Sequence, residues 1–277
     1  MPDAPEAFSL TVDGHIAQLR LCRPEAYNTL NPAFWRELPQ LIESIDRAAE
    51  ARVIVLSAEG KHFTAGMDLA VFAESQRSAP EPGRAGEAMR RLVLHLQQAF
   101  NALEHCRIPV LAAVQGGCIG GGVDMVCAAD SRYCTEDAFF CVKETEIGIV
   151  ADLGTLQRLP RLIPEGLARE LAYTSRRMSA EEALRVGLVN QVFANVSDMQ
   201  AGVLDIASQI ANKSPLCIAG TKRMLNYNHD HGVSDALDYM ATWQAGMFHE
   251  TDLLAAMSAG KEEQPEYHPL EPLGDEL

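Results

Sequence analysis

A cluster of glycines in the middle of the chain constrains its fold more than any other feature. Five of the seven residues from Gly116 to Gly122 are glycine, and the apolar run Val123–Ala129 follows them directly. Glycine lets the main chain approach another group closely, and the apolar run predicts a buried helix. The cluster therefore points the N-terminus of a helix into a cleft, where free N–H groups and the helix dipole favour an oxygen that is or becomes negative.

A second strand followed by a glycine turn occurs earlier in the chain. The β-branched run Arg52–Leu56 leads through the Gly60 loop to HFTAGMDLA, where the pattern again predicts a turn and then a helix. The N–H of Met67 in this turn and the N–H of Gly121 in the glycine cluster could hold one oxygen between them. Alternatively, both are simply tight turns. The chain has no P-loop motif and the cluster has no GxGxxG, which disfavours nucleotide binding by those devices.

Local signals predict the first elements of the chain. Residues 8–21 alternate around Asp13-Gly14 and predict a hairpin with a turn of the primed type. Asn31-Pro32 predicts the start of an amphipathic helix that runs to about residue 51. A loop rich in Pro and Gly is expected over residues 79–86, before a long helix over residues 88–105.

The order of the elements predicts the fold class. Strands alternate with helices over residues 1–195, which predicts an α/β architecture with largely parallel strands. From residue 196 to 277 the spacing of apolar residues is helical throughout. We therefore expect an α/β core followed by a C-terminal α-helical region.

The composition excludes several classes of partner. The chain has 277 residues, 47% of them hydrophobic, and a formal net charge of −15. It can bury a full core, whereas nucleic acid and anionic membrane surfaces are disfavoured because both need clustered Lys and Arg. No window approaches a membrane span. The seven cysteines form no CxxC pair, which favours buried reduced thiols, and the absence of a secretory leader or a C-terminal SKL predicts a cytoplasmic protein.

Three acids lie in or just after the glycine-rich centre, and no nucleophile accompanies them. The chain has no GxSxG motif, and no Cys lies in an obvious reactive setting with a His partner. Asp124 lies in the apolar run GVDMVCA, where an acid must be paired, hydrogen-bonded or protonated. It either tunes a neighbouring acid or forms a buried ion pair with an arginine such as Arg132 or Arg158.

Glu144 and Asp152 each allow a catalytic and a structural interpretation. Glu144 ends the apolar strand FFCVKE, so partial burial would raise its pKa towards that of a general base. Alternatively, it is an exposed acid paired with Lys143. Asp152 precedes LGTLQRL and by itself is typical of a helix N-cap. The residues alone leave these alternatives open.

Three segments resemble one enzyme superfamily. HFTAGMDL, GGCIGGGVDM and VKETEIGIVADLGTLQRLP are similar to segments of the enoyl-CoA hydratase/isomerase (crotonase) superfamily, and the resemblance spans roughly residues 8–260. Within it, Asp124, Glu144 and Asp152 resemble the triad of the Δ3,5-Δ2,4-dienoyl-CoA isomerases. Hydratases of the superfamily carry a Glu at the position of Asp124 and commonly a Gly at that of Asp152. The resemblance implies an α/β fold, a crotonase-like spiral of ββα units with a C-terminal α-helical trimerisation region.

The resemblance also implies a reaction in unsaturated fatty-acid β-oxidation. Glu144 would remove the C2 proton of a 3,5-dienoyl-CoA, and Asp152 would protonate C6 to give the 2,4-dienoyl-CoA. Asp124 would hold the pKa values of these acids apart. The alternatives are an enoyl-CoA hydratase, which would use Asp124 and Glu144 to position water, and a non-catalytic binding protein of the same superfamily.

The partners and the remaining site residues follow from the same resemblance. The substrate would be an acyl-CoA thioester, with coenzyme A as part of it and no metal or separate cofactor. The chain would assemble as a homo-trimer or homo-hexamer. The N–H groups of Met67 and Gly121 would form the oxyanion hole for the thioester oxygen. The segment expected to line the path of the substrate consists of Ala65, Gly66, Met67, Asp68 and Leu69.

Overall fold

The computed structural model describes residues 6–68, 71, 81–248, 250–260 and 263–274. In this part of the chain, six strands form the main sheet, in the order β1-β2-β3-β4-β6-β9. Every neighbouring pair is parallel except the hairpin of β1 and β2, so the expected α/β fold with largely parallel strands is confirmed. The strands are β1 (Phe8–Asp13), β2 (Ile16–Leu21), β3 (Val53–Ala58), β4 (Val110–Val114), β6 (Ser131–Thr135) and β9 (Gln191–Phe193).

The hairpin has the predicted turn type, one residue further along the chain. Asp13 pairs with Ile16, so the two loop residues are Gly14 and His15. Their φ angles are 54° and 65°. Positive φ at both central residues defines a type I′ turn, whose twist matches that of the flanking strands.

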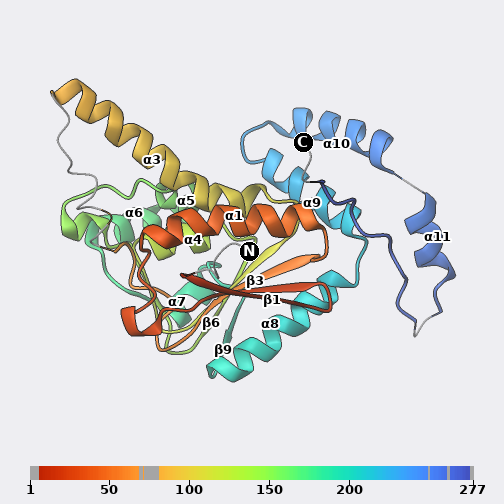
Figure 1. Cartoon of the computed structure of the whole chain (residues 1–277), viewed down its shortest axis with the longest axis horizontal. Coiled ribbons are helices and arrows are strands. Elements are labelled where there is room, and N and C mark those ends of the chain that lie inside the picture. Colours follow the sequence, from red (N-terminus) through yellow and green to blue (C-terminus); the bar gives the residue numbers. More distant parts are fainter. Residues whose placement is uncertain (1–5, 69–70, 72–80, 249, 261–262, 275–277) are drawn as a thin grey trace.

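Alternate residues of the central strands face two different layers of helices. The helices α1 (Pro32–Ala48) and α3 (Pro82–His105) cover one face of the sheet, and α8 (Val196–Ala211) covers the other (Figure 1). On β3, Ile54 and Leu56 belong to the larger core cluster, whereas Val53 and Val55 pack with α8. This division follows the two-residue period of a strand and explains why β3 is apolar on both faces.

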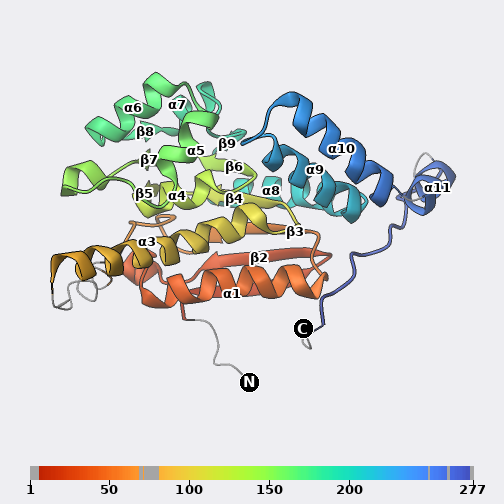
Figure 2. The same cartoon turned by 90° about the horizontal axis from the view of Figure 1, so that it is seen from above.

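A smaller sheet and the helices around it hold the glycine cluster and the acids. This sheet has the order β5-β7-β8 and consists of β5 (Gly117–Ile119), β7 (Phe139–Cys141) and β8 (Met178–Ser179). The nearby helices are α4 (Gly121–Cys127), α5 (Thr155–Leu162), α6 (Glu165–Thr174), α7 (Ala180–Arg185) and the short 3₁₀ helices η1 (Pro24–Ala26) and η2 (Glu144–Ile147). The C-terminal helices α9 (Pro215–Tyr227), α10 (Val233–Met247) and α11 (Glu250–Ser258) lie to the other side of the molecule (Figure 2).

The start of α3 differs from the prediction. The helix begins at Pro82 and not near residue 88, because Glu81 caps it by accepting hydrogen bonds from the N–H groups of Gly83 (3.0 Å) and Arg84 (2.9 Å). The cap and the proline in the first turn stabilise the start of the helix more than the two following glycines destabilise it. Residues 79 and 80 of the predicted loop lie outside the described residues.

The state of the cysteines and the character of the helices agree with what the composition predicted. All seven cysteines are free, and five of them are buried. Burial raises the pKa of Cys127 to about 12, so this thiol stays protonated at neutral pH. Among the described residues, no helix combines the length and the apolar character that crossing a membrane requires.

Candidate active site

The two glycine turns lie directly against each other. Thr64 and Cys118 form an isolated bridge, and the N–H of Ile119 donates a hydrogen bond to the carbonyl oxygen of Thr64 (3.2 Å). Gly66 has a φ of 92°, and a Cβ atom added to it would lie 2.8 Å from the carbonyl oxygen of Ile119. Only glycine fits here, because the neighbouring atom belongs to the backbone and cannot move aside.

The two candidate oxyanion donors, Met67 and Gly121, come just after these contacts in the sequence. Gly121 is the first residue of α4, and its N-cap is Gly120, which has a φ of 54° and no side chain to cap the helix. Within the described part of the chain, neither the N–H of Met67 nor that of Gly121 donates to a protein acceptor. Two free main-chain donors on adjoining turns can stabilise an oxygen atom that gains negative charge.

Glu144 lies in a buried position beside the glycine turn that contains Gly120. A Cβ atom added to Gly120 would lie 3.3 Å from Oε1 of Glu144. The residue is 8% exposed, and its Oε2 has no hydrogen-bond partner in the described structure. Burial, reinforced by the negative charge of Asp124, raises the pKa of Glu144 to about 7. Lys143 pairs with Glu146 instead (2.5 Å), so the interpretation of Glu144 as an exposed partner of Lys143 is wrong.

Asp124 is buried one turn into α4 and is held by the backbone of α5. Its Oδ1 accepts a hydrogen bond from the N–H of Thr155 (2.6 Å). Burial raises the pKa of Asp124 to about 6, against the opposing effect of its contacts with Thr155. Arg132 donates to main-chain carbonyls, and Arg158 pairs with Glu104. The direct ion pair considered for Asp124 is therefore absent from the described structure.

Asp152 completes the group of acids from the segment just before α5. The N-cap of this helix is Gly154, and no side chain caps it, so the interpretation of Asp152 as an N-cap is wrong. The negative charge of Asp152 raises the pKa values of both Asp124 and Glu144. Asp152 is exposed at the surface of the single chain, yet the protein around its carboxyl group still raises its pKa. The charge of Asp152 therefore acts on both of the buried acids.

Comparison with known families accounts for this combination of turns and acids. The sequence matches the family model described as enoyl-CoA hydratase/isomerase over residues 11–267. The chain belongs to this family. The match covers the two glycine turns, the three acids and all of the C-terminal helices that the structure describes.

Curated relatives within the family include dienoyl-CoA isomerases. The mitochondrial Δ3,5-Δ2,4-dienoyl-CoA isomerase of Homo sapiens is 44% identical over 251 residues, which is 90% of this chain and 76% of that protein. The peroxisomal Δ3,5-Δ2,4-dienoyl-CoA isomerase of Arabidopsis thaliana is 44% identical over 92% of both chains. The carnitinyl-CoA dehydratase of Escherichia coli K12 is less similar, with 34% identity over 85% of this chain and 86% of that protein.

Solved structures of the family have the same fold. An enoyl-CoA hydratase from Bacillus anthracis superposes with a TM-score of 0.85 and 31% identity, over 95% of this chain and 99% of that chain. A hydratase from Thermobifida fusca, solved in complex with acetoacetyl-CoA, has a TM-score of 0.78 and 28% identity, over 87% and 94% of the two chains. The expected crotonase fold, with its C-terminal helices, is thereby confirmed.

Most of the residues expected to line the path of the substrate are described. Ala65 is exposed, Gly66 is buried, and Met67 and Asp68 are partly buried. The hydroxyl of Thr29 donates a hydrogen bond to Oδ2 of Asp68 (3.1 Å). Leu69 lies outside the described residues.

Two contacts of the acids have no signal in the sequence. Thr155 holds Asp124 through a main-chain N–H, which almost any residue could supply. Nε2 of Gln97 donates a hydrogen bond to the carbonyl oxygen of Asp152 (2.7 Å), across 55 positions of the chain. Only the tertiary structure brings these groups together.

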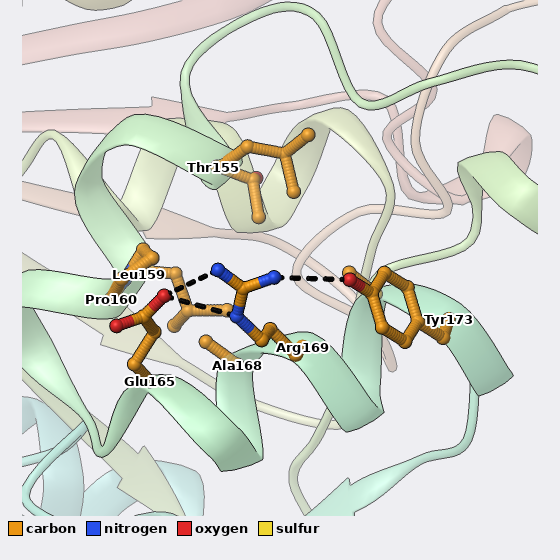
Figure 3. A pocket seen from close by; sticks show the side chains of 9 residues that line it. Thr155, Leu159, Pro160, Glu165, Ala168, Arg169 and Tyr173 are labelled. Carbon is orange, nitrogen blue, oxygen red and sulfur yellow. Dashed lines mark hydrogen bonds and ion pairs between the residues drawn. The ribbon is translucent and has the colours of Figure 1, made fainter.

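A cavity of about 240 Å³ lies between α5 and α6 (Figure 3). Arg169 lies along it, hydrogen-bonded to Glu165 (2.6 Å) and to the hydroxyl of Tyr173 (3.2 Å). The remaining lining residues are Thr155, Leu156, Leu159, Pro160, Ala168 and Ala172. None of the three acids lines this cavity, but Thr155, whose N–H group holds Asp124, does.

Proposed function

We propose that this protein is a Δ3,5-Δ2,4-dienoyl-CoA isomerase, which converts a 3,5-dienoyl-CoA to the 2,4-dienoyl-CoA. The observation that carries the proposal is the coupling of a third acid, Asp152, to Asp124 and Glu144. Hydration of an enoyl-CoA needs no such additional acid, whereas moving two double bonds needs proton transfer at both ends of a conjugated system. The 44% identity to isomerases from two kingdoms supports the same assignment.

The first step is removal of the C2 proton. Glu144 is buried beside the glycine turn that contains Gly120 and has a pKa near neutrality, as a general base requires. Its carboxylate takes the proton, and the C2–H bonding electrons spread over the thioester oxygen and the diene carbons as a dienolate. The N–H groups of Met67 and Gly121 hold the oxygen end of this anion. Each preorganised donor of this kind contributes about 3–4 kcal/mol to stabilising the transition state.

The second step returns a proton at the far end of the conjugated chain. The protonated carboxyl of Asp152 gives its proton to C6, the electrons settle as double bonds at C2 and C4, and the oxygen returns to a carbonyl. Glu144 ends protonated and Asp152 ionised, so the site regains its starting state by exchanging protons with water. The charge of Asp124, buried beside both acids, keeps their protonation linked.

Two substitutions separate the two steps. Tritium placed at C2 of a 3,5-dienoyl-CoA reports proton removal through its release into water, and the ultraviolet change on conjugation to the thioester reports the complete reaction. Asp152→Asn should release tritium but form no 2,4-dienoyl-CoA, whereas Glu144→Gln should do neither. Asp13→Asn, an exposed acid in the β1-β2 turn, serves as the control. Full isomerisation by the Asp152→Asn variant would exclude the role proposed for this residue.

The same preparation tests the rival activities. Incubation with a 2-enoyl-CoA and analysis for the 3-hydroxyacyl-CoA measures hydratase activity, the alternative suggested by the structural neighbours. Strong hydration without diene isomerisation would replace our proposal. Binding of acyl-CoA with neither reaction would indicate a non-catalytic member of the family. We also propose that coenzyme A enters as part of the substrate and that no separate cofactor takes part.

The assembly and the compartment belong to the same proposal. We propose a homo-trimer or homo-hexamer, supported by apolar residues that α10 and α11 leave exposed. The seven free cysteines fit a reducing compartment. The names of the relatives place them in mitochondria and in peroxisomes, whereas we propose the cytoplasm for this chain. Fractionation of cells that produce the full chain tests the compartment.

A further inference from the structure

One stripe of α3 holds the segment that carries Asp152. Gln97, Asn101 and Glu104 are spaced four and three residues apart, so their side chains lie on the same side of the helix. Nε2 of Gln97 donates to the carbonyl oxygen of Asp152 (2.7 Å). Asn101 and Glu104 both accept hydrogen bonds from Arg158 in α5. The chain from Asp152 to Arg158 is therefore fixed to α3 at each end.

Arg158 makes the second of these two contacts rigid. Its Nε and Nη2 both donate to Oε2 of Glu104, at 2.9 and 2.5 Å, and its Nη2 also donates to Oδ1 of Asn101 (2.8 Å). The guanidinium packs on Gly154, where an added Cβ atom would lie 2.0 Å from Nη1 of Arg158. This end of the segment cannot shift without breaking a largely buried ion pair.

Among the described residues, Gln97 is the only one whose side chain forms a hydrogen bond to Asp152 itself. In the described part of the chain, the carboxyl group of Asp152 accepts no hydrogen bond from another residue and forms no ion pair. The direction of this carboxyl group therefore depends on where its backbone is held. Gln97 holds the carbonyl oxygen of the same residue, and its own side chain is partly buried.

We propose that Gln97 is a positioning residue for Asp152, which sets the second proton transfer and leaves the first unchanged. This inference rests on the proposed function. Glu144 lies in η2 beside the glycine turn, and in the described structure Gln97 forms no hydrogen bond to either. Loss of the Gln97 side-chain amide frees the backbone of Asp152 and moves its carboxyl group away from C6. Displacement of a reacting group by about 1 Å can slow a step by about 100-fold.

The test compares Gln97→Leu with Gln98→Leu. The two glutamines are adjacent on α3, but Gln98 is exposed and forms no hydrogen bond to the Asp152 segment. For Gln97→Leu we expect diene isomerisation to fall by about 10- to 100-fold while tritium release from C2 stays at the level of the unsubstituted enzyme. Gln98→Leu should leave both rates unchanged. Gln97→Glu has the same shape but cannot donate to the carbonyl oxygen, so it should show the same selective loss.

Each other outcome has a definite meaning. Equal losses of isomerisation and tritium release in Gln97→Leu would show general damage to the site and overturn the inference. Unchanged isomerisation in both Gln97 variants would overturn it as well. Absence of isomerisation by the unsubstituted enzyme would instead remove the proposed function, and this inference with it.

Discussion

At the scale of single residues, burial decides the chemistry of the three acids. Loss of water is the largest cause of the raised pKa of Glu144, Asp124 and Asp152. Repulsion from neighbouring acids adds to it at Glu144 and Asp124. The backbone N–H of Thr155 opposes the shift at Asp124, whereas one oxygen of Glu144 has no hydrogen-bond partner in the described structure. Glu144 therefore has a higher pKa, about 7, than Asp124, at about 6, as expected for the base.

The pH dependence of proton removal follows from this pKa. Glu144 must be ionised to act as the base, and its raised pKa of about 7 means that it is protonated at pH 5. Tritium release from C2 should therefore increase with pH through about 7 and level off above it. Asp124→Asn removes a charge that raises this pKa, so its midpoint should move to lower pH, while Asp13→Asn should leave the midpoint unchanged. A midpoint of Asp124→Asn at or above that of the unsubstituted enzyme would contradict the coupling of the two acids.

At the scale of elements, the contact between the two glycine turns makes the oxyanion site sensitive to one methyl group. Gly66→Ala would place its Cβ atom 2.8 Å from the carbonyl oxygen of Ile119, so the turns would have to separate. Loss of one oxyanion donor costs about 100- to 1,000-fold in turnover, and we expect a loss of that order in the isomerase assay.

Gly187→Ala is the matched control for this substitution. Its φ of 84° is close to the 92° of Gly66, so both variants carry a similar backbone strain. The nearest atom to its added Cβ, however, would be 3.9 Å away. Gly187→Ala should therefore lose stability to urea but keep its turnover. A Gly66→Ala variant as active as this control would argue against tight packing of the turns as a requirement for catalysis.

Local signals and tertiary contacts explain which elements could be predicted from the sequence. Asn31 and Pro32 predicted the start of α1, and the side chain of Asn31 does accept a hydrogen bond from the N–H of Phe34 (2.9 Å). The apolar run around Asp124 correctly indicated burial. The predicted start of α3 near residue 88 was wrong because the helix begins at Pro82, where Glu81 caps it. No local pattern could indicate that Lys143 pairs with Glu146 rather than Glu144, since both acids are close to it in sequence.

The C-terminal region shows why the boundary at residue 196 says little about packing. Although the described elements after β9 are all helices, α8 packs on the main sheet through Met199, Val203 and Ala207, which belong to the smaller core cluster. The next helix, α9, is joined to the core by the buried Lys222. Its ammonium group donates to the carbonyl oxygens of Leu103 (2.9 Å) and Ile108 (3.0 Å) and pairs with Asp130 (2.8 Å). Both helices are therefore part of the same folded body as the α/β core.

At the scale of the whole molecule, α10 and α11 differ from every α-helix described before them. All residues of these two helices are described, and none is buried in the single chain. They form part of the wall of an apolar cavity of about 670 Å³ that they share with α9. Leu237, Leu254 and Met257 are 65%, 59% and 74% exposed. Because packing of an apolar face supplies most of the stability of a helix in a protein, these helices need another surface to cover them.

A second copy of the chain is the partner that best fits this surface. Besides the C-terminal helices, the segment beside Asp152 exposes Ile147 (57%) and Val150 (67%). One chain thus carries two separate apolar surfaces. If one surface of each copy contacts the other surface of the next copy, the copies form a closed ring when the rotation between neighbours allows it. Such a contact would also cover the exposed Asp152 and exclude bulk water from the second proton transfer.

The oligomeric state in solution tests this arrangement. Sedimentation at micromolar concentration should give three or six times the mass of the chain. The double variant Leu254→Glu with Met257→Glu places two charges in the apolar surface of α11 and should sediment as a single chain, with lower isomerase turnover if neighbouring copies cover Asp152. Val12→Glu introduces a charge at an isolated exposed apolar residue of β1 and should keep the assembly intact. If the unsubstituted protein sediments as a single chain and is fully active, then α10 and α11 have no role in assembly, and Asp152 acts while exposed to water.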